Sequence, residues 1–234
     1  MRGVGKLPTL GRMEFFSPLL AADPASPRLT VYDDSTGARL DFSATTLNNW
    51  ACKIANMLSD EFDLAEGDSI GVCLPAGWQA TVIAVGAAAL GITVEYSDIS
   101  TVAVLFASAD RVPQDADCEI CLVTADPFGR GVAECGGTVP DGMVDFGPTV
   151  RMYGDDYPWP TPTVADYLTQ QHPQLELPEP GARLLSTGFH DAESFARCVL
   201  APWAVGGSAV VVHSVASTSR VEEIAAAEKV TGRI

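Results

Sequence analysis

The sequence predicts an α/β fold in three layers, with a largely parallel sheet flanked by helices and an N-terminal β-hairpin. Short apolar runs of strand length alternate with segments of helical periodicity along most of the chain. The uncharged stretch 69–94 is divided by turn residues into a strand, a helix and a second strand. Two strand-like runs also flank the turn sequence Asp-Ser-Thr-Gly at 34–37. Together these features favour parallel strands joined by helical crossovers.

The hairpin and the helix after it open the predicted fold. Residues 28–33 and 39–42 form its two short strands, because the intervening residues are typical of a tight turn. Ser43 is expected to cap a helix. The apolar residues that follow recur at three- and four-residue steps and are Leu47, Trp50, Ala51, Ile54, Met57, Leu58 and Phe62. This is the clearest amphipathic helix in the sequence.

The uncharged stretch 69–94 is long enough to cross a bilayer, yet the turn residues that divide it indicate a β-α-β unit. Pro75 to Gly77 separates a strand at 69–74 from an Ala-rich helix at 77–90, and Gly91 precedes a strand at 92–96. A loop at bilayer depth would leave backbone groups without hydrogen bonds. We therefore expect a buried helix between two strands and no membrane association.

The second half of the chain is expected to begin with two more strands and a long irregular segment. The strands are 102–106 and 120–124, and the segment covers about 126–181. Seven of the sixteen prolines lie between Pro148 and Pro180 of this segment, which a short helix at 164–170 interrupts. The expected elements after it are a strand at 182–185, a helix at 191–205, a strand at 208–213 and a helix at 219–229.

Residues 1–12 are expected to form a flexible extension, and residues 13–234 a single α/β domain. The extension is Gly-rich and basic, and it lacks the apolar region of a targeting peptide. Met13 opens a more typical globular sequence. The length of the remainder suits one domain.

Charge and cysteine content restrict the function classes. Thirty acidic residues against fourteen basic ones give a net charge of −16, which argues against nucleic-acid binding. The six cysteines are scattered and form no dense disulfide framework. We expect a reducing, cytoplasmic setting.

Cys118 and Cys121 have a spacing that occurs in zinc sites and in redox-active pairs. A zinc site needs two further ligands, and His172, His190 and His213 are unpaired along the sequence, the last of them at a strand end. The two cysteines lie at the start of an apolar run, where residues three apart point to opposite faces of a strand. We expect ordinary, partly buried cysteines and no metal site.

The one candidate phosphate-binding turn follows the strand at 182–185. Ser186, Thr187 and Gly188 lead from this strand towards a helix, whose N-terminal amides could meet an anion. No Lys follows in the turn, and Asp191 would repel a phosphate while being well suited to cap the helix. The sequence contains no His-Glu-x-x-His motif. It predicts no catalytic residues.

Three stretches, 28–74, 78–96 and 198–231, resemble in order the N-terminal part of adenylate-forming enzymes. This superfamily includes acyl- and aryl-CoA ligases, peptide-synthetase adenylation domains and luciferases. The first stretch resembles the family's strand pair, helix and Gly-Asp strand, exemplified by GDSIGVCLP at 67–75. The second resembles its Ala-rich helix and strand, and the third its passage from a Pro-Leu helix through a Gly-rich turn into a buried strand. The resemblance implies the fold of that N-terminal part.

The resemblance also implies a Thr-Ser-Gly-rich phosphate loop that contains a Lys, and here the sequence departs from the family. Residues 182–188 resemble the strand and the beginning of that loop, and only Ser186, Thr187 and Gly188 can be carried across. The family's adenine motif, ribose-binding Asp segment and C-terminal domain with its catalytic Lys have no counterpart in this sequence. Adenylation needs compensation of the phosphate charges by such groups.

We therefore predict a degenerate, non-catalytic, truncated AMP-binding-like domain without a cofactor, which acts as a binding or partner module. Truncation of the larger fold would expose apolar surface, so a homo-oligomer or a protein partner is expected. One alternative is retained binding of a nucleotide (ATP or AMP) or an acyl ligand at 186–188. A second is that the chain is one part of a split acyl-CoA ligase. A third is an unrelated small α/β enzyme that uses Cys118 and Cys121.

Overall fold

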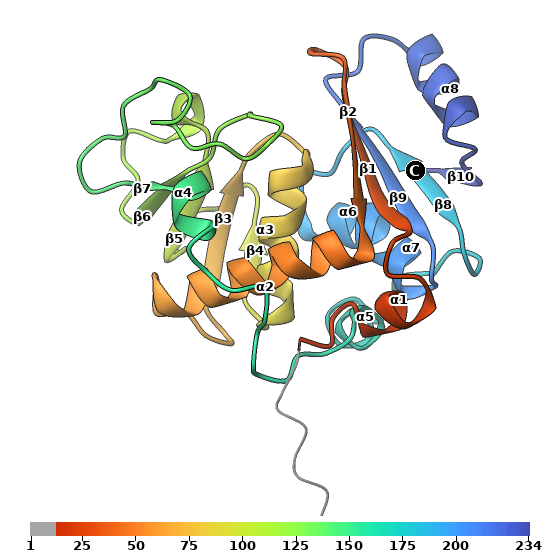
Figure 1. The fold of residues 1–234 in the computed structure, drawn as a ribbon, viewed down its shortest axis with the longest axis horizontal. Helices are drawn as coiled ribbons and strands as arrows, with labels where there is room; N and C mark the ends of the chain where they lie inside the picture. The colour runs from red at the N-terminus through yellow and green to blue at the C-terminus, as the bar shows by residue number, and fades with distance from the viewer. Residues whose placement is uncertain (1–12) are drawn as a thin grey trace, which may run out of the picture.

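The computed structural model describes residues 13–234, which form two five-stranded sheets with helices between and around them (Figure 1). The predicted extension, residues 1–12, lies outside the described residues. The α/β class, the parallel strands and the N-terminal hairpin are confirmed. The division of the strands between two sheets is an additional feature that their alternation with helices does not reveal.

The first sheet has the strand order β10-β8-β9-β1-β2. Its strands are β1 (Pro27–Asp33), β2 (Ala38–Ser43), β8 (Arg183–Ser186), β9 (Ser208–His213) and β10 (Gly232–Arg233). The hairpin strands β1 and β2 are antiparallel, whereas β9 pairs in parallel with both β1 and β8. The sheet therefore joins the first elements of the described chain to its last ones.

The second sheet has the order β4-β3-β5-β6-β7 and is parallel throughout. Its strands are β3 (Ser69–Cys73), β4 (Thr93–Glu95), β5 (Val104–Ala107), β6 (Glu119–Leu122) and β7 (Val144–Asp145). The uncharged stretch 69–94 forms β3, the next helix and the start of β4, as predicted. In the described part of the chain, no helix combines the length and the apolar character that a bilayer crossing requires.

The helices around the sheets are α1 (Ser17–Ala22), α2 (Ala44–Asp60), α3 (Trp78–Ala89), α4 (Phe146–Val150), α5 (Val164–Gln171) and α8 (Thr218–Ala227), with a 3₁₀ turn at Ala109–Arg111. The sequence pattern did not reveal α1, α4 or the 3₁₀ turn. Ser43 caps α2 as predicted, since its hydroxyl accepts a hydrogen bond from the amide of Thr46 at 3.2 Å. The segment 126–181 contains β7 and α4 in addition to the predicted α5.

The predicted helix at 191–205 is continuous but irregular. It comprises α6 (Ala192–Phe195), a π-helical turn (Ala196–Leu200) and α7 (Ala201–Ala204). Pro202 lies in the first turn of α7 and has no amide to bond to the residue four positions earlier. A wider π turn just before such a proline accommodates the missing hydrogen bond.

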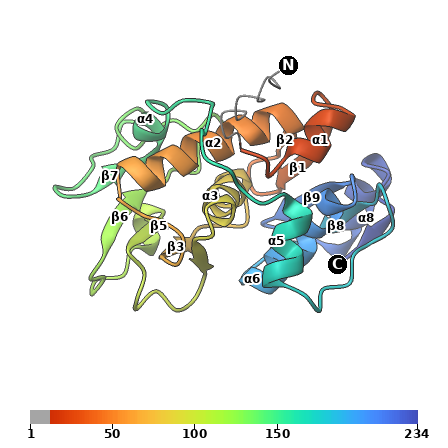
Figure 2. The same cartoon turned by 90° about the horizontal axis from the view of Figure 1, so that it is seen from below.

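A shared apolar core connects the two sheets. It contains Leu29 and Val31 from β1, together with Ile70 from β3 and Phe106 from β5. Helix α3 lies between the sheets in Figure 1, and nearly every residue of it is buried. Figure 2 shows α2 running from the side of α4 to the side of α1, against α3. The two sheets are thus held by one layer of helices, which places their carboxyl edges near each other.

Candidate functional site

A cavity of about 540 Å³ lies where the carboxyl ends of strands from both sheets converge. The first sheet contributes Asp33 at the end of β1 and His213 at the end of β9. The second sheet contributes the residues that directly follow β3, β5 and β6, namely Leu74, Pro75, Ser108, Val123, Thr124 and Ala125. Ligands of open α/β sheets bind outside the carboxyl ends of their strands, so this position is the expected one for a binding site.

Trp78, in the first turn of α3, forms part of the apolar wall of the cavity. Its ring stacks on Phe42 with centroids 5.4 Å apart and packs against Trp50 at 5.0 Å. Only 4% of Trp78 is exposed, so these contacts fix its orientation. Val31 and Leu40 complete this side of the cavity. The wall is preformed and apolar.

The polar end of the cavity is formed by Asp33 and His213. Burial lowers the pKa of His213, although the negative charge of Asp33 opposes the shift, and the imidazole is therefore neutral at pH 7. Burial raises the pKa of Asp33, but hydrogen bonds from Ser35 and Thr36 outweigh it and keep this pKa below its ordinary value. His213 Nδ1 lies 3.8 Å from Asp33 Oδ1. This end of the cavity thus holds one ionised carboxylate beside a neutral imidazole.

The 3₁₀ turn after β5 brings two further charges to the rim of the cavity, Asp110 and Arg111. A hydrogen bond from Ser108 lowers the pKa of Asp110, which keeps it ionised. The lining therefore holds two carboxylates, Asp33 and Asp110, against one guanidinium, Arg111. This composition is weakly negative and does not suit a polyphosphate.

Helix α3 begins at the wall of the cavity with no side chain capping its N-terminus, and Gly77 is its first flanking residue. A Cβ atom at Gly77 would lie 3.5 Å from His213 Nε2, so the imidazole edge reaches this turn. The amide nitrogen of the Gln79 side chain donates to the carbonyls of Thr124 at 2.7 Å and Asp126 at 3.1 Å. These bonds fix α3 to the end of β6.

The turn at Ser186, Thr187 and Gly188 lies beside the cavity but does not contribute to its lining. Gly188 has a φ of +122°, and a Cβ there would lie 3.2 Å from the Cβ of Ala76, which is flanked by the lining residues Pro75 and Gly77. Ser186 is buried beside the Cys198 thiol, and its Oγ makes no hydrogen bond of ordinary geometry, while Thr187 is exposed.

Asp191 caps the helix that follows this turn, as predicted. Its carboxylate accepts a hydrogen bond from the amide of Ser194 at 2.7 Å, and the Ser194 hydroxyl pairs with the backbone of Asp191. The helix N-terminus that would face a phosphate is therefore already occupied by a carboxylate.

Cys118 and Cys121 do not come together. Cys121 is buried in the core that faces α2 and α3, whereas Cys118 packs against the outer face of the second sheet. Burial raises the pKa of both thiols, which disfavours the reactive thiolate. Among residues 13–234, no three His, Cys, Asp or Glu side chains are grouped as metal ligands.

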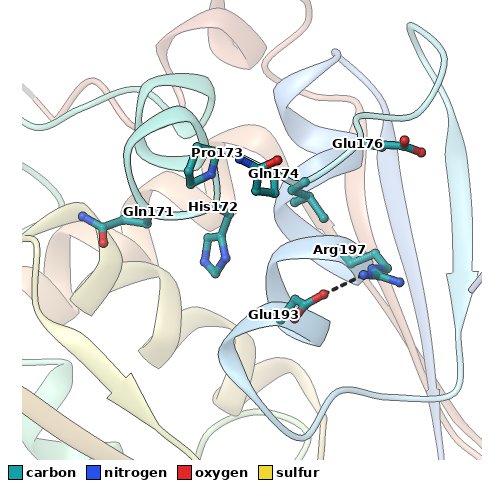
Figure 3. A pocket seen from close by; sticks show the side chains of 8 residues that line it. Gln171, His172, Pro173, Gln174, Glu176, Glu193 and Arg197 are labelled. Atoms are coloured by element: carbon teal, nitrogen blue, oxygen red, sulfur yellow. Dashed lines mark hydrogen bonds and ion pairs between the residues drawn. The ribbon is translucent and has the colours of Figure 1, made fainter.

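A second cavity of about 600 Å³ lies between the C-terminal end of α5 and α6 (Figure 3). Its polar groups are partly paired with each other, since Arg197 bonds to Glu193 at 2.7 Å. Burial lowers the pKa of His172, the residue that directly follows α5. No strand of either sheet contributes a residue to this cavity, so we regard the cavity at the carboxyl edges as the candidate site.

The fold is that of the N-terminal part of adenylate-forming enzymes. The Brucella canis acyl-CoA synthetase superposes with a TM-score of 0.73 and 12% sequence identity, covering 98% of this chain and 48% of that one. The anthranilate CoA ligase AuaEII, solved with anthranoyl-AMP, superposes with a TM-score of 0.66 and 13% identity, covering 99% and 51%. The chain thus spans about half the length of these structures.

A curated relative is found in Mycobacterium tuberculosis (strain ATCC 25618 / H37Rv), where it is named "TIGR03089 family protein". It is 36% identical over 157 residues, which make up 63% of this chain and 62% of the relative. No family model matches the chain.

The residues that line the cavity were only partly visible in the sequence. His213 stands out as the polar end of an apolar strand, and Asp33 ends the first strand of the hairpin. Asp33 and His213 are partners in the parallel register of β1 and β9, so their side chains meet at one edge of the sheet. The signal that could have found them is a polar residue at the carboxyl end of each predicted strand.

Proposed function

We propose that this chain is a non-catalytic small-molecule-binding module built on the fold of adenylate-forming enzymes. The observation that supports this most directly is the preformed cavity at the carboxyl edges of both sheets, with its fixed Trp78 wall and its polar end at Asp33 and His213. Its volume of about 540 Å³ suits a small organic molecule.

Adenylation by this chain alone is disfavoured by charge. The reaction concentrates negative charge on phosphates and on an attacking carboxylate, which needs cationic and N–H donors around it. The cavity supplies one guanidinium, from Arg111, against two carboxylates. The turn at 186–188 leads into a helix start that the carboxylate of Asp191 already caps.

The test combines an activity assay with a binding assay. ATP–pyrophosphate exchange in the presence of a panel of aliphatic and aromatic carboxylic acids should remain at the background of a protein-free reaction, while an authentic acyl-CoA ligase gives a signal in parallel. Exchange that rises in proportion to this protein would overturn the proposal.

Binding in the cavity is tested by a variant that fills it. Ala38 lies at the cavity and is only partly buried at the start of β2, so Ala38→Phe places a ring in the space without replacing a core residue. We expect this variant to fold and to lose any ligand detected by the parent protein. Ala25→Phe, at an exposed position before β1, is the matched control and should bind as the parent does.

Retained nucleotide or acyl-ligand binding at 186–188 is a second candidate, supported by the buried Ser186 hydroxyl that makes no ordinary hydrogen bond. Under this candidate, AMP, ATP or acyl-CoA at 100 times its Kd would add about 2.7 kcal/mol to the free energy of unfolding. Thr187→Ala would remove the effect. The proposal of a cavity ligand predicts no such shift.

A role as a partner module in the cytoplasm stays part of the proposal, as a homo-oligomer, a complex with another protein or one chain of a two-chain ligase. Met152 and Trp159 support it, since 75% and 65% of these apolar residues are exposed within one segment. Light scattering on a concentration series should give a mass above that of one chain. A constant monomer mass would argue against self-association, and co-purification from the native source tests the other partners.

A further inference from the structure

We propose that the cavity between the two carboxyl edges selects an uncharged or singly cationic molecule with an apolar body, of the aryl- or alkylamine or alcohol class, over the corresponding carboxylate. This inference rests on the proposed function, because it names the chemical class of the ligand at the same cavity. It reverses the preference for anions that a phosphate or carboxylate site would have.

The apolar part of the cavity defines the body of the ligand. Trp78 presents a ring whose position is fixed by Phe42 and Trp50, and Leu74 and Val123 border it from the second sheet. Burial of an aromatic or short aliphatic group against this wall contributes about 25 cal/mol for each Å² removed from water. A preformed wall also reduces the entropic cost of ordering side chains when the ligand binds.

The charges at the polar end define the head group. Asp33 and Asp110 are both ionised, and Arg111 compensates for only one of them. The neutral imidazole of His213 adds no positive charge. The uncapped N-terminus of α3 carries the equivalent of about half a positive charge, which is smaller than the remaining negative charge. The chain as a whole carries −16, which acts in the same direction.

The hydrogen-bonding groups at this end can serve such a head group. Asp33 already accepts hydrogen bonds from the amide of Ser35 at 3.0 Å, the hydroxyl of Ser35 at 2.6 Å and the hydroxyl of Thr36 at 2.9 Å. Two carboxylate oxygens accept about four bonds in all, so Oδ2, which accepts from Thr36, can take one more. His213 Nδ1 lies 3.3 Å from Ser214 Oγ, while Nε2 faces the Gly77 turn. An ammonium or hydroxyl group can therefore donate to Asp33. A carboxylate would meet the carboxylate of Asp33 at the same place.

The experiment uses three probes with one body, 3-phenylpropan-1-amine, 3-phenylpropan-1-ol and 3-phenylpropanoate, titrated into the full chain at pH 7 and followed by NMR and calorimetry. We expect the amine to bind at least tenfold more tightly than the carboxylate, with the alcohol between them. Raising the salt concentration should weaken the binding of the amine only, because salt screens its charge interactions. Equal or tighter binding of the carboxylate would overturn the inference.

A matched pair of variants locates the effect. Asp33→Asn should lower the affinity for the amine at least threefold and leave the affinity for the alcohol unchanged. Asp141→Asn, at an exposed position outside the cavity lining, should change neither affinity. Unaltered amine binding in Asp33→Asn contradicts the proposed role of this carboxylate.

Ala38→Phe separates the two proposals. Loss of all three probes in this variant supports the cavity as the site, whichever probe binds best. Binding that survives in Ala38→Phe, or the absence of binding by every probe up to 10 mM (roughly 2.7 kcal/mol of binding free energy), refutes the proposed function itself. Binding in the cavity with a preference for the carboxylate refutes only the selectivity.

Discussion

At the scale of single residues, Glu228 connects three elements through one carboxylate. It accepts hydrogen bonds from Tyr32 Oη at 2.6 Å and Arg39 Nε at 2.8 Å, and it pairs with Arg183. Only 9% of its side chain is exposed. Burial raises its pKa, but the bonds from Arg39, Tyr32 and Arg183 outweigh this and lower the pKa to about 2. The carboxylate thus ties the hairpin and β8 to the end of α8.

Glu228→Gln is expected to lower the free energy of unfolding by about 1–2 kcal/mol at pH 7. The amide keeps the size of the side chain, but it leaves the Arg183 guanidinium without its counter-charge and leaves Arg39 paired with Asp41 alone. The loss stays moderate because 43% of the Arg39 side chain is exposed and water screens part of its charge. Urea unfolding measures it. Glu222→Gln removes an exposed pair between α8 and Arg233 of β10, so it is the control and should have little effect.

The lowered pKa of Glu228 also predicts how its contribution to stability depends on pH. The pKa of Glu228 in the folded protein, about 2, lies below its ordinary value of 4.5, so its contribution to stability is present above pH 4.5 and is lost as the pH falls towards 2. The difference in unfolding free energy between the parent and Glu228→Gln should therefore be constant from pH 7 to pH 5 and shrink at pH 3. A difference that is the same at pH 3 and pH 7 would contradict this account.

At the scale of elements, α2 and α3 approach each other closely at Gly86. A Cβ atom there would lie 2.5 Å from Cγ2 of Ile54 and 3.4 Å from the carbonyl of Ala51. Ala is favoured over Gly in a helix by about 1 kcal/mol, but the overlap exceeds this gain. Gly86→Ala should therefore lower the free energy of unfolding by about 1–3 kcal/mol, as measured by urea unfolding.

A double variant isolates the contact at Gly86. Ile54→Ala removes the Cγ2 atom that the new methyl group would meet. Gly86→Ala combined with Ile54→Ala should therefore be less destabilised than the sum of the single variants. Strict additivity would show that the helices do not meet at this point.

The individual elements were predictable because each rests on a local pattern. The periodicity after Ser43 predicts α2, and the alternation of strands with helices predicts parallel pairing. Helix α1, the strand β10 and the π turn before Pro202 carry no periodic signal of their own, because tertiary packing determines them. The candidate site likewise has one part that a local pattern reveals and one part that tertiary structure determines. The turn at 186–188 is visible in sequence, whereas the cavity is formed by the ends of strands that only the three-dimensional structure brings together.

At the scale of the whole molecule, the distribution of strands over two sheets depends on long-range pairing. Strand β9 lies between β1 and β8, so the hairpin at the start of the described chain pairs with a strand near its end. No local pattern specifies that β3 to β7 form a separate sheet. The shared core of α2, α3 and both sheets then makes the two halves dependent on each other.

We predict from this shared core that the chain unfolds as one cooperative unit. Three of the four tryptophans divide between its two sides, while Trp159 is exposed. Trp203 packs under the first sheet and donates to the carbonyl of Arg28 at 2.7 Å, whereas Trp50 and Trp78 lie together beside α2 and α3. A variant with Trp50, Trp78 and Trp159 changed to Phe reports on the first sheet by fluorescence. A variant with Trp159 and Trp203 changed to Phe reports on the other side.

In each variant, the urea midpoint from tryptophan fluorescence should equal that from far-ultraviolet circular dichroism, because both probes follow the same transition. The comparison is made within one variant, so a loss of stability from the Phe substitutions does not affect it. A fluorescence midpoint that differs from the dichroism midpoint would show that the two sheets unfold separately. The cavity, whose lining comes from both sheets, would then be lost as soon as the less stable sheet unfolds.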